Sequence, residues 1–319
     1  MRVLYQRSVR RDETWLYSLA GLEDSLERIG MAAVPYDPSP ASTFVARGLG
    51  KLRLLRRIAQ LREEAVFVAL MGPMESRLFP RCFFGNSVVY CFDCWPREWA
   101  KWASLFRRHR IELAFFSARR SAEAFSSLLP EMQSVWLPEA TDPHAYDPSK
   151  PLAERTIDVL ELGRRHEPVH AKIVGPLARG DETHKYQLAE GEIVFPSREA
   201  LVTGLGDTKL SILFPSSLTH PSRSGDVETV THKYFESIAS GCIPLGRCPT
   251  ELEDLFGYDP VVPLDESDPV AHIRALLGDL DAHRCLVERN RARLLEVGTW
   301  DARAQTLLSA LQARDYALD

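Results

Sequence analysis

The sequence predicts an α/β protein with two domains, each a parallel sheet wound with helices. The chain has 319 residues, enough for two domains of ordinary size. Apolar runs of strand length alternate with amphipathic stretches of helix length, and this alternation is typical of parallel sheets. Residues 138–151 divide the alternation into two halves, because their four prolines exclude a continuous helix or strand.

The first alternation extends from the first residue to the proline-rich segment. Its apolar runs predict strands at 1–5, 65–70, 88–92, 111–117 and 135–137. Its amphipathic stretches predict helices at 14–30, 48–64, 97–110 and 121–129. We therefore place an N-terminal Rossmann-like domain at 1–140 and a linker at 141–156.

The second alternation follows the linker. It predicts strands at 157–162, 210–215 and 243–245 and helices at 168–178, 230–240, 269–280 and 282–296. Residues 204–206 (GLG) are interpreted as a turn. We place a C-terminal Rossmann-like domain at 157–299 and a last helix at 300–319.

Composition excludes several classes of protein. Hydrophobic residues make up 45% and charged residues 26%, as in folded globular chains. The net charge of −5 gives no general attraction to nucleic acid. The absence of an apolar leader and of a membrane-spanning apolar run leads us to expect a cytoplasmic protein. No G-x-G-x-x-G follows the first strand, so we expect neither a nicotinamide nor a flavin cofactor.

Two carboxylates near the start of the predicted helix 230–240 are the strongest functional signal. Thr229 and Thr231 are expected to cap this helix and to leave the backbone N–H groups of its first turn free, at Val230 and His232 among others. Such a helix start binds phosphate readily. Glu236, deeper in the helix, is then placed to accept hydrogen bonds from the ribose hydroxyls of a nucleotide. Glu228, in the preceding loop, would face the sugar.

The motif and its flanks resemble those of the retaining glycosyltransferases of the GT-B fold, of the group-1 or family-four type. Glu228 and Glu236 match the E-x7-E signature, and residues 238–244 (IASGCIP) resemble the turn that follows it. The proline-rich segment resembles the interdomain segment of the same enzymes. The resemblance implies two Rossmann-like domains facing a cleft, with a last helix that crosses back to the N-terminal domain. It also implies hexosyl transfer from a nucleotide diphosphate sugar to an acceptor hydroxyl, with retention of configuration.

The resemblance also assigns cations to the departing diphosphate. Residues 157–165 (IDVLELGRR) resemble the strand of the family that ends in "G-R", which gives Arg164 the role of binding the diphosphate. A lysine usually follows, and both Lys172 and Lys209 are candidates; surface exposure without a role is an equal alternative for each. Because such cations stabilise a leaving group without a metal, we expect metal-independent transfer. The Asp279-Leu280-Asp281 triplet is interpreted as a solvated helix end rather than a metal site.

On the acceptor side, Asp93 follows the strand 88–92. It either orients a sugar or acceptor hydroxyl or caps the helix that begins near Pro96. The histidine that many relatives carry in this loop is replaced by Cys91 or Phe92. This replacement favours an alternative function, a nucleotide-sugar-binding protein without transferase activity. A second alternative is a dithiol oxidoreductase that uses Cys91 and Cys94.

Residues 47–62 are basic and contain no acidic side chain. Their leucines form an apolar face, so the predicted helix either packs on the sheet or lies on an anionic membrane, at its inner face. The expected partners are a nucleotide-sugar donor and an acceptor, which is a glycan, a lipid-linked molecule or a small molecule.

Overall fold

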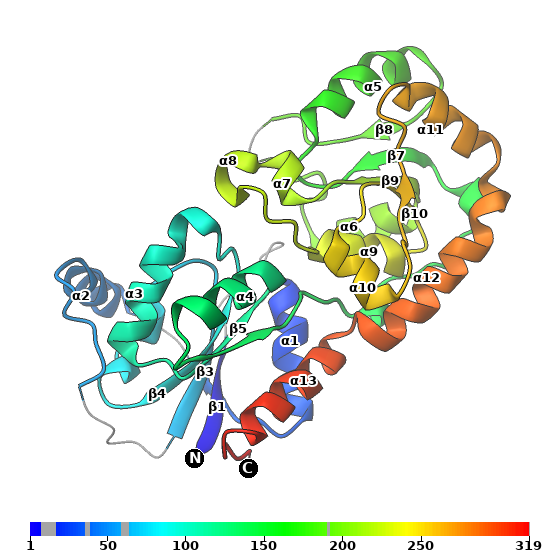
Figure 1. The fold of residues 1–319 in the computed structure, drawn as a ribbon. Coiled ribbons are helices and arrows are strands. Elements are labelled where there is room, and N and C mark those ends of the chain that lie inside the picture. The colour runs from blue at the N-terminus through cyan, green and yellow to red at the C-terminus, as the bar shows by residue number, and fades with distance from the viewer. Residues whose placement is uncertain (8–16, 36–38, 59–63, 190–191, 319) are drawn as a thin grey trace. The chain divides into compact units, whose positions relative to one another are not determined.

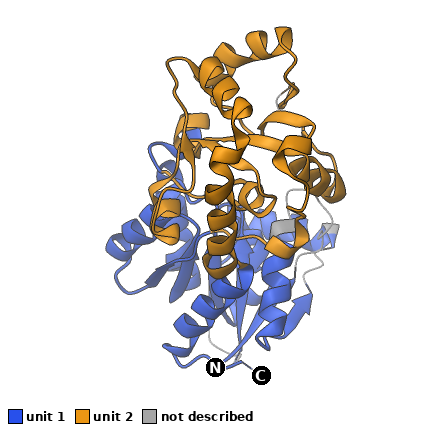
Figure 2. Ribbon diagram, turned by 90° about the vertical axis from the view of Figure 1, so that its right-hand side faces the viewer, with its two compact units in different colours: residues 1–138, 223–227, 300–319 blue, residues 139–222, 228–299 orange. Residues whose placement is uncertain are grey.

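The computed structural model describes residues 1–7, 17–35, 39–58, 64–189 and 192–318. These form two compact units, coloured separately in Figure 2. Unit 1 consists of Met1–Pro138, Arg223–Val227 and Trp300–Asp319, and unit 2 consists of Glu139–Ser222 and Glu228–Thr299. The chain therefore contributes three separate segments to unit 1.

Unit 1 is built on a six-stranded sheet in which every pairing is parallel, with the order β2-β1-β3-β4-β5-β6 (Figure 1). Its strands are β1 (Arg2–Arg7), β2 (Ala33–Pro35), β3 (Glu64–Leu70), β4 (Asn86–Cys91), β5 (Leu113–Phe116) and β6 (Gln133–Trp136). Its helices are α1 (Tyr17–Arg28), α2 (Pro40–Lys51), α3 (Trp99–His109), α4 (Arg119–Leu128) and α13 (Trp300–Gln312), with 3₁₀ turns η1 (Glu75–Leu78), η2 (Arg81–Phe83) and η3 (Pro96–Glu98).

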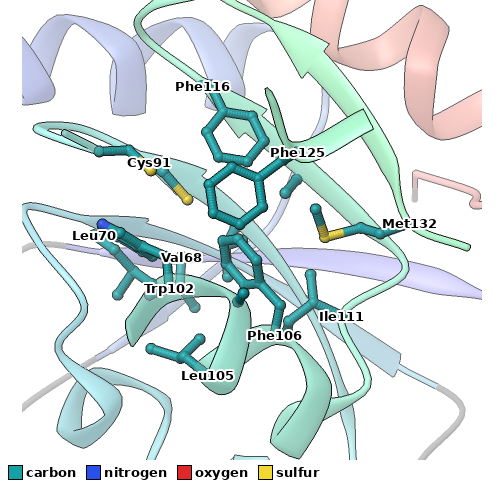
Figure 3. Packing of buried hydrophobic residues seen from close by; sticks show 14 of the residues in the cluster. Val68, Leu70, Cys91, Trp102, Leu105, Phe106, Ile111, Phe116, Phe125 and Met132 are labelled. Atoms are coloured by element: carbon teal, nitrogen blue, oxygen red, sulfur yellow. The ribbon is translucent and has the colours of Figure 1, made fainter. Parts of the chain in front are cut away.

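Aromatic side chains fill the space between this sheet and the helices α3 and α4. Phe125 lies between Phe116 and Phe106, with ring centroids 5.0 and 5.2 Å away (Figure 3). Trp102 and Cys91 are fully buried in the same cluster. Each of these rings removes a large apolar area from water, so this cluster is the main apolar core of the unit.

Unit 2 is built on a five-stranded sheet, also parallel throughout, with the order β11-β10-β9-β7-β8. Its strands are β7 (Ile157–Glu161), β8 (His184–Lys185), β9 (Thr208–Leu213), β10 (Ile243–Gly246) and β11 (Val262–Pro263). The helices of this part of the chain are α5 (Glu167–Arg179), α6 (Arg198–Gly206), α7 (Ser216–Thr219), α8 (Pro221–Ser224), α9 (His232–Ala239), α10 (Thr250–Phe256), α11 (Pro269–Gly278) and α12 (Arg284–Val297), with 3₁₀ turns η4 (Pro143–Ala145), η5 (Leu152–Glu154) and η6 (Leu280–His283).

The predicted fold class is confirmed: the chain is α/β with two Rossmann-like units, each on a parallel sheet. The last helix, α13, belongs to unit 1 and packs on α1. Trp300, at the start of α13, is buried against Gly21 of α1. An ion pair between Arg28 and Asp301 (2.6 Å) joins the two helices at the surface.

Two element predictions were wrong. The helix predicted at 48–64 lies earlier, at α2, because Ser39 caps it and Pro40 starts it; it ends before Arg53, whose φ is +55°. The rest of the predicted stretch is not helical up to Ile58, and residues 59–63 lie outside the described part. Residues 204–206, interpreted as a turn, are the last residues of α6.

In the part of the chain that the structure describes, no helix combines the length and the apolar character needed to cross a membrane.

Candidate functional site

Several candidate residues of unit 2 lie where its parallel strands end. Arg164 follows β7, Phe214 follows β9 and Arg247 follows β10. Because the strands are parallel, these ends lie at one edge of the sheet, which is where ligands bind in open α/β sheets. The helix α9 contacts this edge, since the ammonium of Lys233 donates to the Phe214 carbonyl at 2.9 Å.

The two motif glutamates lie in different environments. Glu228, in the loop before α9, is partly exposed, and its Oε1 lies 3.2 Å from Nε of Arg247. Glu236, the fifth residue of α9, is buried, with an exposed fraction of 1%. The hydroxyl of Tyr146 donates to Glu236 Oε1 at 3.2 Å. Burial raises the pKa of Glu236 to about 8, so this carboxyl gains and loses its proton near neutral pH.

The predicted start of this helix is wrong in detail. The helix begins at His232 rather than at 230, and the Thr231 hydroxyl makes no capping hydrogen bond. The Thr229 hydroxyl and the Val230 N–H both donate to Oε2 of Glu251, at 3.1 and 3.0 Å.

A second carboxylate lies at the first turn itself. The His232 N–H donates to Oε2 of Glu139 at 2.9 Å, and Nδ1 of the same histidine lies 3.0 Å from that oxygen. Two of the backbone groups expected to be free for phosphate, those of Val230 and His232, are therefore bound to carboxylates of the protein.

Lys233, on α9 itself, lies near enough to Arg164 for the two charges to interact, and the sequence singled out only Arg164. Arg164 is exposed, on the turn after β7 that begins with Gly163 at φ +75°. Burial, aided by the charge of Arg164, lowers the pKa of Lys233 to about 8, while Glu161 opposes the shift. Like charges held close in this way favour an anion between them.

The two lysines proposed from the sequence have other partners. Lys172, on α5, donates to the backbone carbonyl of Glu266 at 2.5 Å. Lys209, at the start of β9, forms an ion pair of 2.6 Å with Asp158. Lys209 therefore lies at the opposite end of its strand from Phe214 and Lys233.

Asp93 of unit 1 lies in the loop after β4, at φ +53°. It does not cap a helix: the residue that precedes η3 is Trp95. Its Oδ2 instead pairs with Arg223 at 2.6 Å. Arg223 belongs to the short segment 223–227, which Val227 also anchors by packing on Trp95 and Ala118.

The structure argues against a redox pair. Cys91 and Cys94 are both buried, as Figure 3 shows for Cys91 among Phe116 and Phe125. Burial raises the pKa of each thiol well above its ordinary value. Reactive cysteines need an accessible thiolate, so this burial makes both thiols inert.

One buried cluster among the described residues has the side chains of a metal site: Glu161, His170 and His184. Nδ1 of His170 and Nε2 of His184 lie 2.6 and 2.9 Å from Oε1 of Glu161. Arg165 donates to Nε2 of His170 at 3.1 Å, which places the hydrogen of that ring on Nδ1. These hydrogen bonds brace the turn that carries Arg164, but Nδ1 of His184 is buried without a hydrogen-bond partner among the described residues. Asp279 and Asp281 are exposed, and Asp279 caps η6.

Two Rossmann-like units, each on a parallel sheet, define the chain as a protein of the GT-B fold class. No family model matches the sequence, and no curated protein does. Solved structures do match. HepE from Anabaena, in complex with UDP-glucose, is 10% identical with a TM-score of 0.61, over 98% of this chain and 100% of that one. Sucrose-phosphate synthase from Thermosynechococcus elongatus is 11% identical with a TM-score of 0.61, over 98% and 99%.

A glycosyltransferase from Rickettsia africae is 9% identical, with a TM-score of 0.58 over 98% of both chains. These structural neighbours are glycosyltransferases of the GT-B type. At such low identity the likeness establishes the fold alone.

Proposed function

We propose that this protein is a glycosyltransferase that moves a hexose from a nucleotide diphosphate sugar to an acceptor hydroxyl. The observation that carries the proposal is the arrangement at the carboxyl edge of the unit 2 sheet. There Lys233 of α9 contacts the Phe214 carbonyl and senses the charge of Arg164, while Glu236 lies on the same helix and Glu228 in the loop before it. A neighbour of the same fold, HepE, has been solved with UDP-glucose bound. We extend that kind of donor to this chain.

Each residue of this edge then has a role. Arg164 and Lys233 bind the diphosphate and stabilise its charge as it leaves, which supports transfer without a metal ion. Glu236 accepts hydrogen bonds from the ribose, and its buried position orients it for that contact. Glu228 holds the donor sugar, and Arg247 fixes its carboxylate. Asp93, on unit 1, orients a hydroxyl of the acceptor, which is a glycan, a lipid-linked molecule or a small molecule. Retention of configuration follows from the resemblance of the motif.

Titration calorimetry with UDP, GDP and ADP, each with and without EDTA, tests the donor site. One diphosphate should bind selectively and without regard to EDTA. Loss of Lys233 in Lys233→Met should weaken binding about tenfold or more, because one charge-assisted contact to phosphate is lost. Lys172→Met and Lys209→Met are the matched variants: if either weakens binding as much and Lys233→Met does not, the phosphate lysine is assigned wrongly.

A second candidate function is nucleotide-sugar binding without transfer. It is favoured by Asp93, whose carboxylate is paired with Arg223, in a loop that lacks the histidine of many relatives. Turnover separates the two functions. A transferase should release nucleoside diphosphate from its cognate sugar donor, and Glu228→Gln should abolish this release while nucleoside diphosphate still binds. Binding with no release by the unaltered protein, with any acceptor class, would favour the second candidate.

A further inference from the structure

Helix α2 and the residues after it present large apolar side chains to solvent. Phe44 and Leu52 are 79% and 69% exposed, and Val45, Leu54 and Ile58 are also exposed. Exposed apolar side chains are ordinary when scattered, but five within fifteen residues are a concentration that favours an interaction site; we call this concentration the patch.

The packing of α2 explains why this patch cannot simply turn inward. Ala46 is the buried residue of the helix, and Leu49 packs against the core cluster of unit 1. Leu55, just after the helix, is fully buried in the same cluster. Among the described apolar residues of this segment, only Ala46, Leu49 and Leu55 pack inward on unit 1, whereas larger apolar side chains, such as Phe44, are exposed to solvent. An ordinary surface helix has the reverse arrangement.

The charge of the patch has one sign. Arg47, Lys51, Arg53 and Arg56 are exposed, and residues 39–58 contain no acidic side chain. Among the described residues, no acidic group forms an ion pair with any of the four. The chain as a whole has a net charge of −5, so this surface is a local exception.

A groove of about 990 Å³ opens beside the patch, between α2 and α3, which lie next to each other in Figure 1. Phe44 lies on its lining, together with Arg47, Lys51, Arg53 and Lys101. The acid that lines it, Glu75, is held by Arg108 at 2.8 Å. Burial opposes ionisation of this acid, but hydrogen bonds from His109 and Arg108 keep its pKa low. The groove is therefore positive in sum, with room for phosphate groups.

We propose that the α2 surface, formed by Phe44, Val45, Arg47, Lys51–Leu54, Arg56 and Ile58, docks the protein on an anionic lipid bilayer. Apolar side chains flanked by unpaired cations match the boundary between acyl chains and phosphate headgroups. A protein partner would need a surface that matches this particular arrangement of cations and apolar side chains. An anionic bilayer carries phosphate headgroups above acyl chains over its whole surface, so it matches the arrangement without such a special fit. The inference rests on unit 1 alone and does not depend on the proposed function.

Flotation of the full chain with phospholipid vesicles tests the proposal. The protein should float with vesicles that contain phosphatidylglycerol, less with phosphatidylcholine alone, and less as salt rises. The Phe44→Ser, Leu52→Ser double variant should lower the partition coefficient about tenfold or more. Each cation removed in Lys51→Ala, Arg53→Ala should lower it about fivefold at low salt.

Two matched variants in unit 2 serve as controls. Leu188→Ser removes a leucine that is 71% exposed, and Arg284→Ala removes an exposed cation. Both should bind vesicles like the unaltered protein. Equal flotation of the α2 variants, or no flotation with anionic vesicles, would overturn the proposal. A third outcome would also overturn it: the unaltered protein sediments as a dimer and does not bind vesicles, and the Phe44→Ser, Leu52→Ser variant sediments as a monomer. The patch would then be the contact between two copies of the chain.

Discussion

Lys233 is placed to respond to pH in the physiological range. Its pKa of about 8 is depressed mainly by burial, and a bound diphosphate would raise it. The association constant for nucleoside diphosphate should therefore be highest below pH 8, where Lys233 is protonated, and should fall above pH 8 by up to about tenfold per pH unit. Calorimetry between pH 7 and 9 measures this fall. Because Glu236 titrates in the same window, the difference between the unaltered protein and Lys233→Met isolates the lysine, and an unchanged slope in the variant would contradict the assignment.

Burial of the Glu236 carboxyl should lower the stability of the folded protein at neutral pH. Its folded pKa of about 8 lies above the ordinary 4.5, so the folded state holds a proton that the unfolded chain releases. The stability contributed by that proton is complete below pH 4.5 and is lost as pH rises toward 8. Glu236→Gln should remove this loss and raise the free energy of unfolding at pH 7 by about 3 kcal/mol at most.

Denaturant unfolding from pH 5 to 8 tests this prediction, with Glu228→Gln as the partly exposed control. The curve of Glu236→Gln should be flatter than that of the unaltered protein, and nucleotide binding should weaken at the same time. Parallel curves for the two proteins would show that the buried carboxyl has an ordinary pKa.

At this scale the sequence predicts the motif but not its surroundings. Glu228 and Glu236 are recognisable because their spacing and flanks resemble the E-x7-E signature. Lys233 is not, since its contact is a carbonyl nineteen residues earlier, at Phe214, which no local pattern reveals. Glu139 is a similar case: it precedes the predicted linker, and only the folded chain brings it to His232.

Among the elements, α1 and α13 pack so closely at Gly21 that adding one methyl group there should push the two helices apart. A Cβ at Gly21 would lie 2.6 Å from Cδ1 of Trp300, a buried ring with no room to move. Gly21→Ala should lower the free energy of unfolding by about 1–3 kcal/mol. Gly48→Ala is the matched control, because it is also helical and a Cβ there meets nothing within 4 Å.

The control should raise stability by about 0.5–1 kcal/mol, since alanine favours the helix over glycine. Thermal unfolding of both variants measures the contrast. Equal effects of the two substitutions would mean that Trp300 does not press on α1.

The predicted boundaries of a helix are correct where large apolar side chains lie on its buried face, and they are wrong where those side chains are exposed. The helices α3 and α4 bury aromatic rings, so their periodicity places them within a few residues. In α2 the large apolar side chains Phe44 and Val45 are exposed, so the helix has no large apolar buried face. The leucines that follow, Leu52 and Leu55 among them, imitate such a face, and the predicted helix was therefore placed too late in the chain. The signal that would have placed it correctly is the Ser39-Pro40 start.

For the molecule as a whole, the division of unit 1 into three segments predicts how truncation acts. A chain that ends at residue 299 lacks α13, whose buried Trp300, Leu307 and Leu311 cover part of unit 1. Their loss should remove several kcal/mol of stability, about 2 for each side chain. Hydrogen exchange should lose protection in 1–138 and retain it in 157–297, and equal loss in both would contradict the division into units.

The α/β class could be predicted because strand and helix periods alternate along most of the chain. The return of the last helix to unit 1 was expected from the resemblance of the motifs and not from any period. The short strands β2, β8 and β11 could not, because two or three residues carry no period. Their place is set by pairing with longer strands, which is a property of the folded sheet.

The place of α13 in the chain has a consequence for synthesis on the ribosome. Residue 138 is made long before residue 300, and the 161 residues between them take about 8–32 s at ordinary elongation rates. During that interval the first unit has its sheet but lacks the helix that covers α1 beside Gly21. The nascent chain therefore carries an uncovered apolar surface until its last helix emerges, and the unit translated first is the one completed last.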